Sequence, residues 1–407
     1  MSVVTIVSGN FCHLETVVCK VVERTGYRHI DQGQIVARAA VESKMAEGKI
    51  MQAFGAKQSI FNRFTHERER SVAYLRLALA QILADGDGIV TGACGLLIPA
   101  RIVHVLRVCL IADRKHRILV GMAEENLTRQ AAEEEIFRHD ADLSAWLRGL
   151  DKGDDPWERG LYDMVLTMDK TPPDVAAELV AHNALSDLVS RTPRSETAQG
   201  DYLLAARVET ALSLAGHHVS VSAQDGAVTL TINRNVLMLD RLAEELCTLA
   251  REVAGVRCVT TTVGEGFYRN DIYRKVDFEI PAKVLLVDDE RSFVQTLSER
   301  LIMREMGVVV AYDGPSALTM IAEQEPEVVV LDLKMPGMNG LEVLRQVKSR
   351  QPEIEVIILT AHGSEVDRQL SLGLGAYAYL RKPVDIDLLS RTICKAYEKA
   401  AGKALSR

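Results

Sequence analysis

Short apolar runs that end in acidic residues restrict the fold of the last third of this chain more than any other feature. Val284–Val287 runs directly into Asp288 and Asp289, and Val328–Leu331 runs into Asp332. Continuous apolar runs of this length are typical of strands that are buried on both faces of a parallel sheet. The carboxyl ends of such strands open onto the ligand crevice of an open α/β sheet. The pattern therefore predicts three carboxylates at one edge of one sheet.

Two further runs bring a hydroxyl group and a cation to the same edge. Val356–Leu359 ends in Thr360, and Ala376–Leu380 leads to Lys382. Hydroxyl and ammonium groups donate hydrogen bonds to phosphoryl oxygens, and carboxylate oxygens are the ligands that Mg²⁺ prefers. An aspartate can also act as a nucleophile toward phosphorus and form an aspartyl phosphate.

The combination predicts a site for magnesium-assisted phosphoryl transfer. We expect Asp288, Asp289 and Asp332 to form the metal site. Asp332 would accept the phosphoryl group, and Thr360 and Lys382 would bind its oxygens. The alternative interpretation is that the acids only cap helices and that Lys382 is an ordinary surface charge.

Residues 283–400 resemble the receiver domain of bacterial two-component response regulators. The matching segments are VLLVDDE, VVVLDLKMPGMNG, VIILTAHG and YLRKP. The resemblance implies a flavodoxin-like (βα)5 domain with strand order 2-1-3-4-5, a cis Lys382–Pro383 peptide bond, and Asp332 as the phosphoacceptor. It places Tyr379 at the position of an aromatic switch residue. It also implies that a sensor histidine kinase or a phosphotransfer protein is the phosphoryl donor.

Composition and charge are those of a globular protein with several domains. The chain has 407 residues and a net charge of −8, which disfavours a dedicated nucleic-acid binder. Its seven cysteines include no C-x-x-C pair, which favours a reducing compartment over a disulfide or zinc framework. No apolar run approaches the roughly 20 residues of a membrane span. We therefore expect a cytoplasmic protein without a transmembrane segment.

The beginning of the chain has the pattern of a phosphate-binding loop without its chemistry. Val3–Val7 is followed by a glycine turn and an apolar-periodic segment, which predicts a strand, a loop and a helix. A phosphate-binding loop needs G-x-x-x-x-G-K-[ST]. Aligned on Gly9, this chain has Leu14 for the second glycine, Glu15 for the lysine and Thr16 for the hydroxyl. A carboxylate would repel phosphate, so a nucleotide is doubtful here, and Gly9 and Thr16 are the candidate contacts if one binds.

Strand and helix candidates alternate as far as residue 192, which predicts a parallel α/β sheet. The segments YRHIDQGQI, GIVTGACG and DPWERGLYDMVLTMD resemble the cytidylate kinase-like branch of the P-loop nucleoside monophosphate kinases. The glycine–arginine pair of that family is Gly92–Ala93 here, and an arginine that its lid carries is missing shortly after Asp140. Phosphoryl transfer depends on positioned positive charge, so we expect a kinase-shaped domain without activity. Weak nucleotide binding, another ligand, a protein partner and a scaffold without ligand all remain open.

An arginine-rich segment, Asn62–Leu83, predicts one polar helix. Arg63, His66, Arg68 and Arg70 are interpreted as its solvated face, or as the remnant of a nucleotide clamp or a partner surface.

A polar segment with turn formers at residues 192–200 marks a boundary, and a small α+β module follows it. The expected elements are a helix, a hairpin around Asp225–Gly226, a second helix and a final strand. Their approximate ranges are 202–214, 218–222, 228–232, 237–253 and 255–263. This order resembles the BON module, which implies binding to phospholipid or to a partner. A generic small interaction module is the alternative.

We therefore expect three α/β or α+β parts: a cytidylate kinase-like domain (1–192), a BON-like module with a linker (193–280) and a receiver domain (281–407). The predicted function is that of a response regulator that accepts phosphate on Asp332 with Mg²⁺ and passes the change to the upstream region. The alternative is a nucleoside monophosphate kinase, of the cytidylate type, that phosphorylation regulates. No helix-turn-helix pattern follows the receiver, so we expect no DNA-binding domain, and a homodimer is compatible with the pattern.

Overall fold

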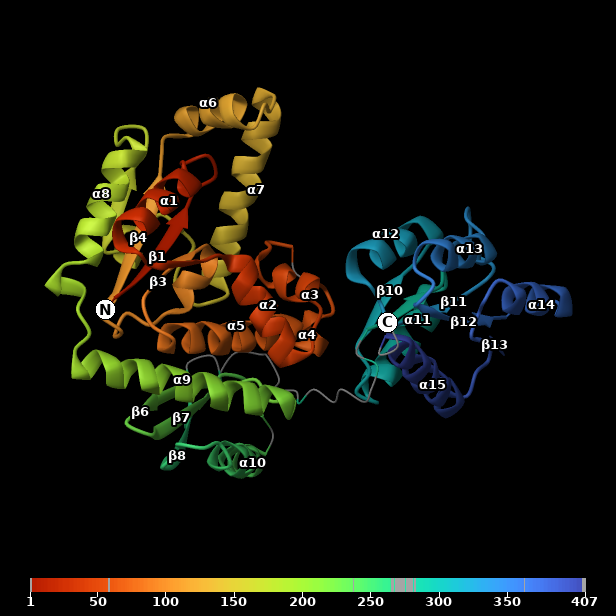
Figure 1. Cartoon of the computed structure of the whole chain (residues 1–407). Helices are drawn as coiled ribbons and strands as arrows, with labels where there is room; N and C mark the ends of the chain where they lie inside the picture. The colour runs from red at the N-terminus through yellow and green to blue at the C-terminus, as the bar shows by residue number, and fades with distance from the viewer. Residues whose placement is uncertain are drawn as a thin grey trace. The chain divides into compact units, whose positions relative to one another are not determined.

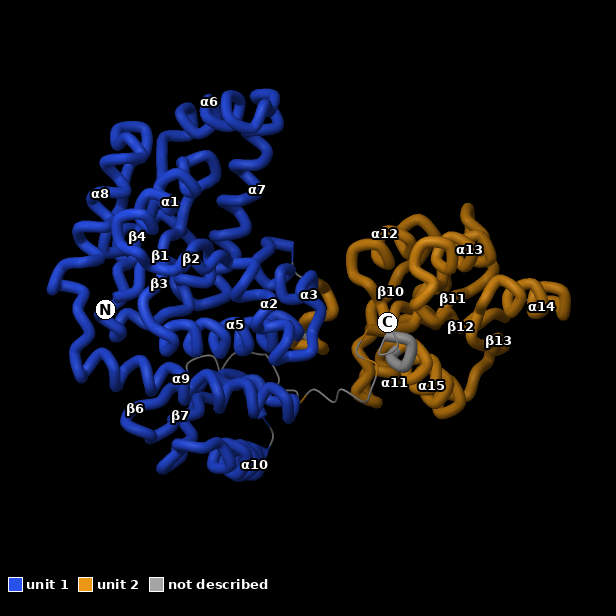
Figure 2. Tube along the Cα trace, in the orientation of Figure 1, with its two compact units in different colours: residues 1–58, 67–273 blue, residues 59–66, 274–407 orange. Residues whose placement is uncertain are grey.

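The structure is a computed structural model of the whole chain. It describes residues 2–57, 59–236, 238–264, 283–361 and 363–404, together with Phe267, Lys275 and Pro281. The chain divides into two compact units, residues 1–58 with 67–273 and residues 59–66 with 274–407 (Figure 2). The linker expected before residue 281 lies almost wholly outside the described residues.

The first unit contains a five-stranded parallel sheet, as the alternation of strand and helix patterns predicts. The strand order is β2-β3-β1-β4-β5, and each neighbouring pair is parallel. The strands are β1 (Val3–Ser8), β2 (Arg28–Ile30), β3 (Gly88–Thr91), β4 (Val105–Ile111) and β5 (Met164–Thr167).

Helices cover both faces of this sheet, because side chains alternate between the two faces of a strand. Val3 and Val7 of β1 belong to one apolar core, and Val4 and Ile6 belong to the other. The first core is completed mainly by α2, α5 and α7, and the second by α1 and α8 (Figure 1). The helices of this domain are α1 (Leu14–Thr25), α2 (Gln32–Ser43), α3 (Glu47–Met51), α5 (Glu67–Ala84), α6 (Arg114–Glu124), α7 (Arg129–Arg148) and α8 (Pro173–Ala184). Helix α4 (Asn62–Thr65) follows α3 in the chain and is grouped with the second unit.

The prediction of one solvated helix over Asn62–Leu83 is wrong in two respects. His66 has a left-handed backbone with φ 48°, and this residue separates α4 from α5. Arg68 and Arg70 are half-buried, and their guanidinium groups donate to main-chain carbonyls, Arg68 to Ala53 and Arg70 to Ser43. These arginines therefore hold neighbouring segments together.

The middle module has the predicted order of elements. The β6–β7 hairpin is antiparallel, and its turn has positive φ at both Asp225 and Gly226, as a tight two-residue hairpin requires. Strand β8 then pairs with β7 in parallel. The elements are α9 (Pro193–Leu214), β6 (Ser220–Gln224), β7 (Ala227–Ile232), α10 (Leu239–Arg251) and β8 (Cys258–Val263).

Helix α9 belongs to two apolar cores. It begins at Pro193, nine residues before the predicted start at Tyr202, so the prediction of a polar linker over residues 192–200 is wrong. The Thr192 side chain accepts the N–H of Ser195, and Pro193 occupies the first helical position. Its first half packs into the core beside α5, and its second half packs against the three-stranded sheet (Figure 1).

The second unit contains another five-stranded parallel sheet, with the order β10-β9-β11-β12-β13. This is the predicted doubly wound order, and apolar layers lie on both of its faces. Its strands are β9 (Val284–Val287), β10 (Val308–Ala311), β11 (Val328–Leu331), β12 (Glu355–Thr360) and β13 (Ala378–Arg381). Its helices are α11 (Arg291–Ile302), α12 (Gly314–Gln324), α13 (Gly340–Arg350), α14 (Glu365–Gly373) and α15 (Ile386–Ala404).

No helix among the described residues is both long enough and apolar enough to span a bilayer. The Lys382–Pro383 peptide bond is cis, as expected.

Candidate functional site

The carboxyl ends of β9, β11 and β12 form the edge at which the acidic residues of the second unit lie. Val287 at the end of β9 is in register with Leu331 of β11, and Leu331 is in register with Ile358 of β12. Asp288 and Asp332 follow their strands directly and are therefore neighbours. The pattern of apolar runs thus placed these residues correctly.

Asp288, Asp289 and Asp332 are close enough to share one cation. One ligand oxygen from each carboxylate lies within 4.8 Å of the others. Asp288 and Asp332 are buried, whereas Asp289 is exposed, so the cluster opens to solvent on one side. Three oxygen donors with room for water suit the octahedral coordination of Mg²⁺. The donor set therefore fits the expected metal.

Lys382 lies among the same carboxylates. Its ammonium group contacts Asp288 Oδ2 and lies 3.2 Å from Asp332 Oδ2, and it also lies over the Phe293 ring, 4.3 Å from the ring centroid. Burial acts to lower the pKa of Lys382, but the hydrogen bond and the charge of Asp288, followed by those of Asp332, outweigh burial and raise it. The lysine is therefore a fixed cation at neutral pH, and it partly neutralises the acidic cluster.

The loop after Asp332 holds this side chain in one orientation. Asp332 Oδ1 accepts the N–H groups of Leu333 at 2.6 Å and Lys334 at 3.3 Å. The chain then returns so closely that a Cβ on Gly340 would lie 2.1 Å from the Asp332 carbonyl oxygen. Gly340 is thus required by a close backbone approach, and sequence inspection did not single it out.

Thr360 and Tyr379 lie on adjacent strands beside the acidic cluster. Thr360 is fully buried at the end of β12, and Ile358 is in register with Tyr379 on β13. A Cβ on Gly363 would lie 1.6 Å from the Tyr379 hydroxyl oxygen and 3.1 Å from Thr360 Cγ2. The tyrosine hydroxyl therefore occupies space that only a glycine at position 363 leaves open. Among the described residues this buried hydroxyl has no hydrogen-bond partner.

The loop after β1 lies where a phosphate-binding loop would lie, but it lacks the second glycine and the lysine of that loop. Gly9 is buried at the end of β1, and its N–H donates to the Leu110 carbonyl at 2.9 Å. Thr16 and Glu15 lie exposed on the first turn of α1. The sequence template thus located the loop, but in the part of the chain that the structure describes no hydrogen bond joins Gly9 to Thr16.

Arg117 is the cation at this loop, and the sequence template missed it. It lies on α6, its side chain is 4% exposed, and its Nε donates to the Asn10 carbonyl at 2.9 Å. Its two terminal nitrogens each donate to the Asp140 carboxylate of α7 at 2.8 Å. Burial alone would raise the pKa of Asp140, but the interaction with His139, whose Nδ1 lies 3.5 Å from Asp140 Oδ1, and the hydrogen bonds from Arg117 lower it below its ordinary value. The pairing is not readable from the sequence, because the partners lie on different helices.

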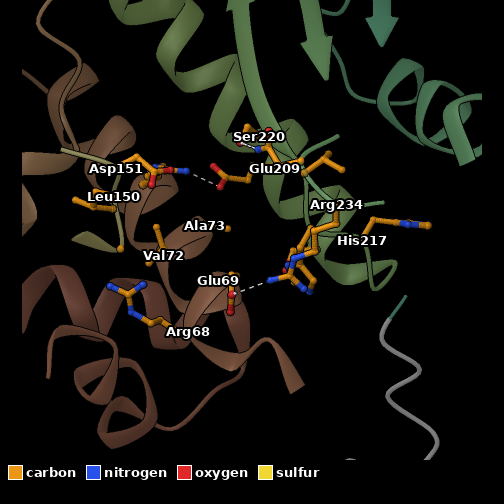
Figure 3. Close-up of a pocket in the computed structure, with 16 residues that line it drawn as sticks. Arg68, Glu69, Val72, Ala73, Leu150, Asp151, Glu209, His217, Ser220 and Arg234 are labelled. Atoms are coloured by element: carbon orange, nitrogen blue, oxygen red, sulfur yellow. Dashed lines mark hydrogen bonds and ion pairs between the residues drawn. The ribbon is translucent and has the colours of Figure 1, made fainter. Parts of the chain in front are cut away.

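A polar cavity of about 290 Å³ lies in the first unit, between α5 and the middle module (Figure 3). Two ion pairs line this cavity: Arg76 lies 2.6 Å from Glu209, and Arg234 lies 3.8 Å from Glu69. Figure 3 shows the second pair crossing from α5 to the segment after β7. Because opposite charges balance across this cavity, its charges select no class of ligand.

Comparisons with known proteins cover both units. Residues 284–393 match the family model of the response regulator receiver domain, and residues 3–170 match that of the cytidylate kinase-like family. The match to the kinase-like family stops before the middle module, and the BON resemblance stays a prediction.

Solved structures similar to this chain are receiver domains. A response regulator receiver domain protein from Clostridium thermocellum is 35% identical, with a TM-score of 0.29, and the alignment covers 30% of this chain and 98% of that one. The receiver domain of NtrX from Brucella abortus is 30% identical, with a TM-score of 0.28, and the alignment covers 28% of this chain and 98% of that one.

Proposed function

We propose that Asp332 accepts a phosphoryl group and that residues 1–273 form a non-catalytic output region. The proposal is supported by the match of residues 284–393 to the receiver domain model and of residues 3–170 to the cytidylate kinase-like model. The receiver domain makes the chain a component of two-component signalling. The phosphoryl donor that fits this role is a phosphohistidine, carried by a sensor histidine kinase or a phosphotransfer protein.

One observation supports the acceptor role above others. Asp332 lies in a cluster of three carboxylates, with the Lys382 ammonium 3.2 Å from its Oδ2. Main-chain N–H groups bind Oδ1, so Oδ2 is the oxygen that we expect to attack phosphorus. The new P–O bond forms as the P–N bond of the donor breaks, and the donor imidazole keeps the electron pair.

A divalent cation held by Asp288, Asp289 and Asp332 would supply charge neutralisation for the incoming phosphoryl group. Lys382 would exchange part of its contact with Asp288 for a hydrogen bond to a phosphoryl oxygen. The Thr360 hydroxyl, on the neighbouring strand, would donate to another oxygen and move toward the site.

The consequence is a two-state switch. The phosphoryl group adds charge that Lys382 and Thr360 bind in one state and not in the other, and only such a differential interaction can shift an equilibrium. Tyr379 is the residue that we expect to report the shift, because its hydroxyl lies against the loop that follows Thr360.

Two features at the loop after β1 support a non-catalytic output role for the first unit. Glu15 stands in the position of the loop lysine, and the guanidinium of Arg117 is bound to Asp140. Phosphoryl transfer depends on cations free to bind the transferred group. We therefore expect this unit to act through binding.

Intact-mass spectrometry after incubation with acetyl phosphate and Mg²⁺ tests the acceptor role. We expect one added phosphoryl group on the wild-type chain, none on Asp332→Asn, and normal labelling of a control, Asp240→Asn, on α10. A wild-type chain that stays unmodified while folded would contradict the proposal.

A coupled assay with ATP and CMP tests the output role separately. We expect no turnover above the background of a Gly9→Val variant. Robust turnover would replace the output proposal with the alternative of a regulated nucleoside monophosphate kinase, and would leave the acceptor role of Asp332 intact.

A further inference from the structure

Arg117 presents a buried cation to the loop after β1. The residue is 3% exposed, and its Nε donates to the Asn10 carbonyl at 2.9 Å. A Cβ on Gly9 would lie 3.1 Å from the guanidinium carbon, so the glycine lets the guanidinium lie against the loop. This loop is at the carboxyl end of a parallel strand, where open α/β sheets bind their ligands.

The anion that this guanidinium binds belongs to the chain itself. Both terminal nitrogens donate to the Asp140 carboxylate at 2.8 Å, which is a bidentate pair. A planar guanidinium makes this same fork with a carboxylate or with a phosphate group. The Asp140 carboxylate therefore occupies the place on Arg117 that a phosphate ligand would take.

Two further contacts hold the α6–α7 hairpin on the same loop. Phe11 packs against a small apolar cluster of α6 and α7, and its ring fills the space beside Gly121, where a Cβ would lie 2.9 Å from Cε2. His13 Nδ1 lies 3.0 Å from Glu124 Oε1. The loop is thus covered by a hairpin that contacts it at three separate points.

We propose that Asp140 is an internal substitute for a phosphate ligand, and that its carboxylate closes a latent phosphate-binding site formed by Arg117 and the loop at residues 9–13. The ligand class is a phosphate or pyrophosphate group, free or as part of a nucleotide. The inference deepens the proposed non-catalytic role of the first unit and rests on it. Because the closure depends on Asp140, a single substitution at this position should reopen the site.

Isothermal titration of the full chain with inorganic pyrophosphate tests the proposal. We expect no saturable heat for the wild type and saturable binding for Asp140→Asn. The gain in affinity should be about tenfold or more, because the incoming anion no longer competes with a buried charged partner. The double variant Arg117→Gln/Asp140→Asn should lose this binding, since it lacks the cation. Glu134→Gln, an exposed acid on the same helix, is the control for net charge and should behave as the wild type.

Thermal unfolding establishes that each variant is folded before titration. A folded Asp140→Asn variant without pyrophosphate binding overturns the proposal, and so does binding that survives in the double variant. Hydrogen exchange of the wild type supplies a test that needs no variant. Pyrophosphate at millimolar concentration should leave the exchange of residues 9–17 unchanged, and protection there would overturn the closure by Asp140.

The same samples separate this inference from the proposed function. Labelling of Asp332 by acetyl phosphate should be equal in the wild type and in Asp140→Asn. Failure to label the wild type contradicts the acceptor role and leaves the latent site standing. Turnover of ATP and CMP by the wild type contradicts both the output role and the closed site.

Discussion

At the scale of single residues, Lys382 holds the acidic cluster together in the absence of other cations. Its ammonium group contacts two buried carboxylates that would otherwise repel each other. A metal ion and this lysine are both attracted by the same carboxylates, so each weakens the binding of the other.

The substitution Lys382→Met should therefore tighten Mg²⁺ binding. Two unit charges at contact distance interact by roughly 1 kcal/mol in water and by roughly 4 kcal/mol at a partly buried site. Removal of the lysine charge removes a repulsion of that size between Lys382 and the metal ion. We expect an increase in affinity of about tenfold, measured by titration calorimetry. Lys395→Met on α15 is the control for net charge, and equal affinities in the two variants would contradict the competition.

Gly363 determines whether Tyr379 can occupy its observed position. A Cβ on Gly363 would overlap the tyrosine hydroxyl, whereas a Cβ on Gly373 at the end of α14 would meet no atom within 4 Å. Gly363→Ala should displace the Tyr379 ring and destabilise the receiver by about 1–3 kcal/mol, the usual cost of overpacking. Fluorotyrosine NMR and urea unfolding measure the two effects. Gly373→Ala should leave the Tyr379 signal unchanged and should not lower the stability, because alanine is favoured over glycine in a helix. An unchanged Tyr379 signal in Gly363→Ala would refute the argument.

At the scale of elements, the α6–α7 hairpin depends on the ionised state of Asp140. The pKa of this carboxyl is lowered in the folded chain, because Arg117 and His139 outweigh the effect of burial. A lowered folded-state pKa stabilises the fold above the unfolded-state value, which is about 3.9 for aspartate. That stabilisation is lost as the pH falls through the folded-state pKa.

The free energy of unfolding of the wild type should therefore decrease, relative to that of Asp140→Asn, as the pH falls below about 4. Urea unfolding followed by circular dichroism, at a series of pH values, measures the difference between the two proteins. A difference that stays constant over this range would show that Asp140 is not stabilised as a carboxylate.

Helix α9 makes the kinase-like part depend on residues beyond position 192. Ala198, Tyr202 and Ala206 of α9 are buried in the core beside α5, whereas Ala205, Val208 and Leu212 are buried in the core of the middle module. A fragment of residues 1–192 should expose the first core. Its melting temperature should be lower than that of residues 1–273 by more than about 5 °C. Scanning calorimetry compares the two fragments, and equal melting temperatures would indicate that residue 192 is an independent boundary.

Helices, strands and site residues could be predicted from the sequence where the pattern that indicates them lies within one short segment. Apolar runs located all the strands of the receiver site, and their acidic ends located Asp288 and Asp332, because parallel strands bring their carboxyl ends to one edge. The break at His66 escaped prediction, because helical periodicity continues on both sides of one left-handed residue. Arg117 also escaped prediction, because its partners Asn10 and Asp140 are distant in the sequence.

At the scale of the whole molecule, the chain joins residues that match a receiver domain to residues that match the cytidylate kinase-like family, and in the second of these matches we propose that Asp140 fills a latent phosphate site. A receiver transmits its phosphorylation only through interactions that differ between its two states. We propose that the first unit supplies this output by binding rather than by catalysis. Under this proposal, the chemistry of the molecule lies in the second unit and its recognition lies in the first.

The position of the phosphoryl group is the most direct test of this account. Borohydride reduces an aspartyl phosphate to homoserine, so reduction of the labelled full chain, followed by proteolysis and tandem mass spectrometry, identifies the acceptor. We expect homoserine at position 332 in the presence of Mg²⁺, and its disappearance when the metal is chelated. Homoserine at another aspartate, or none in a folded and metal-loaded chain, would contradict the assignment of Asp332.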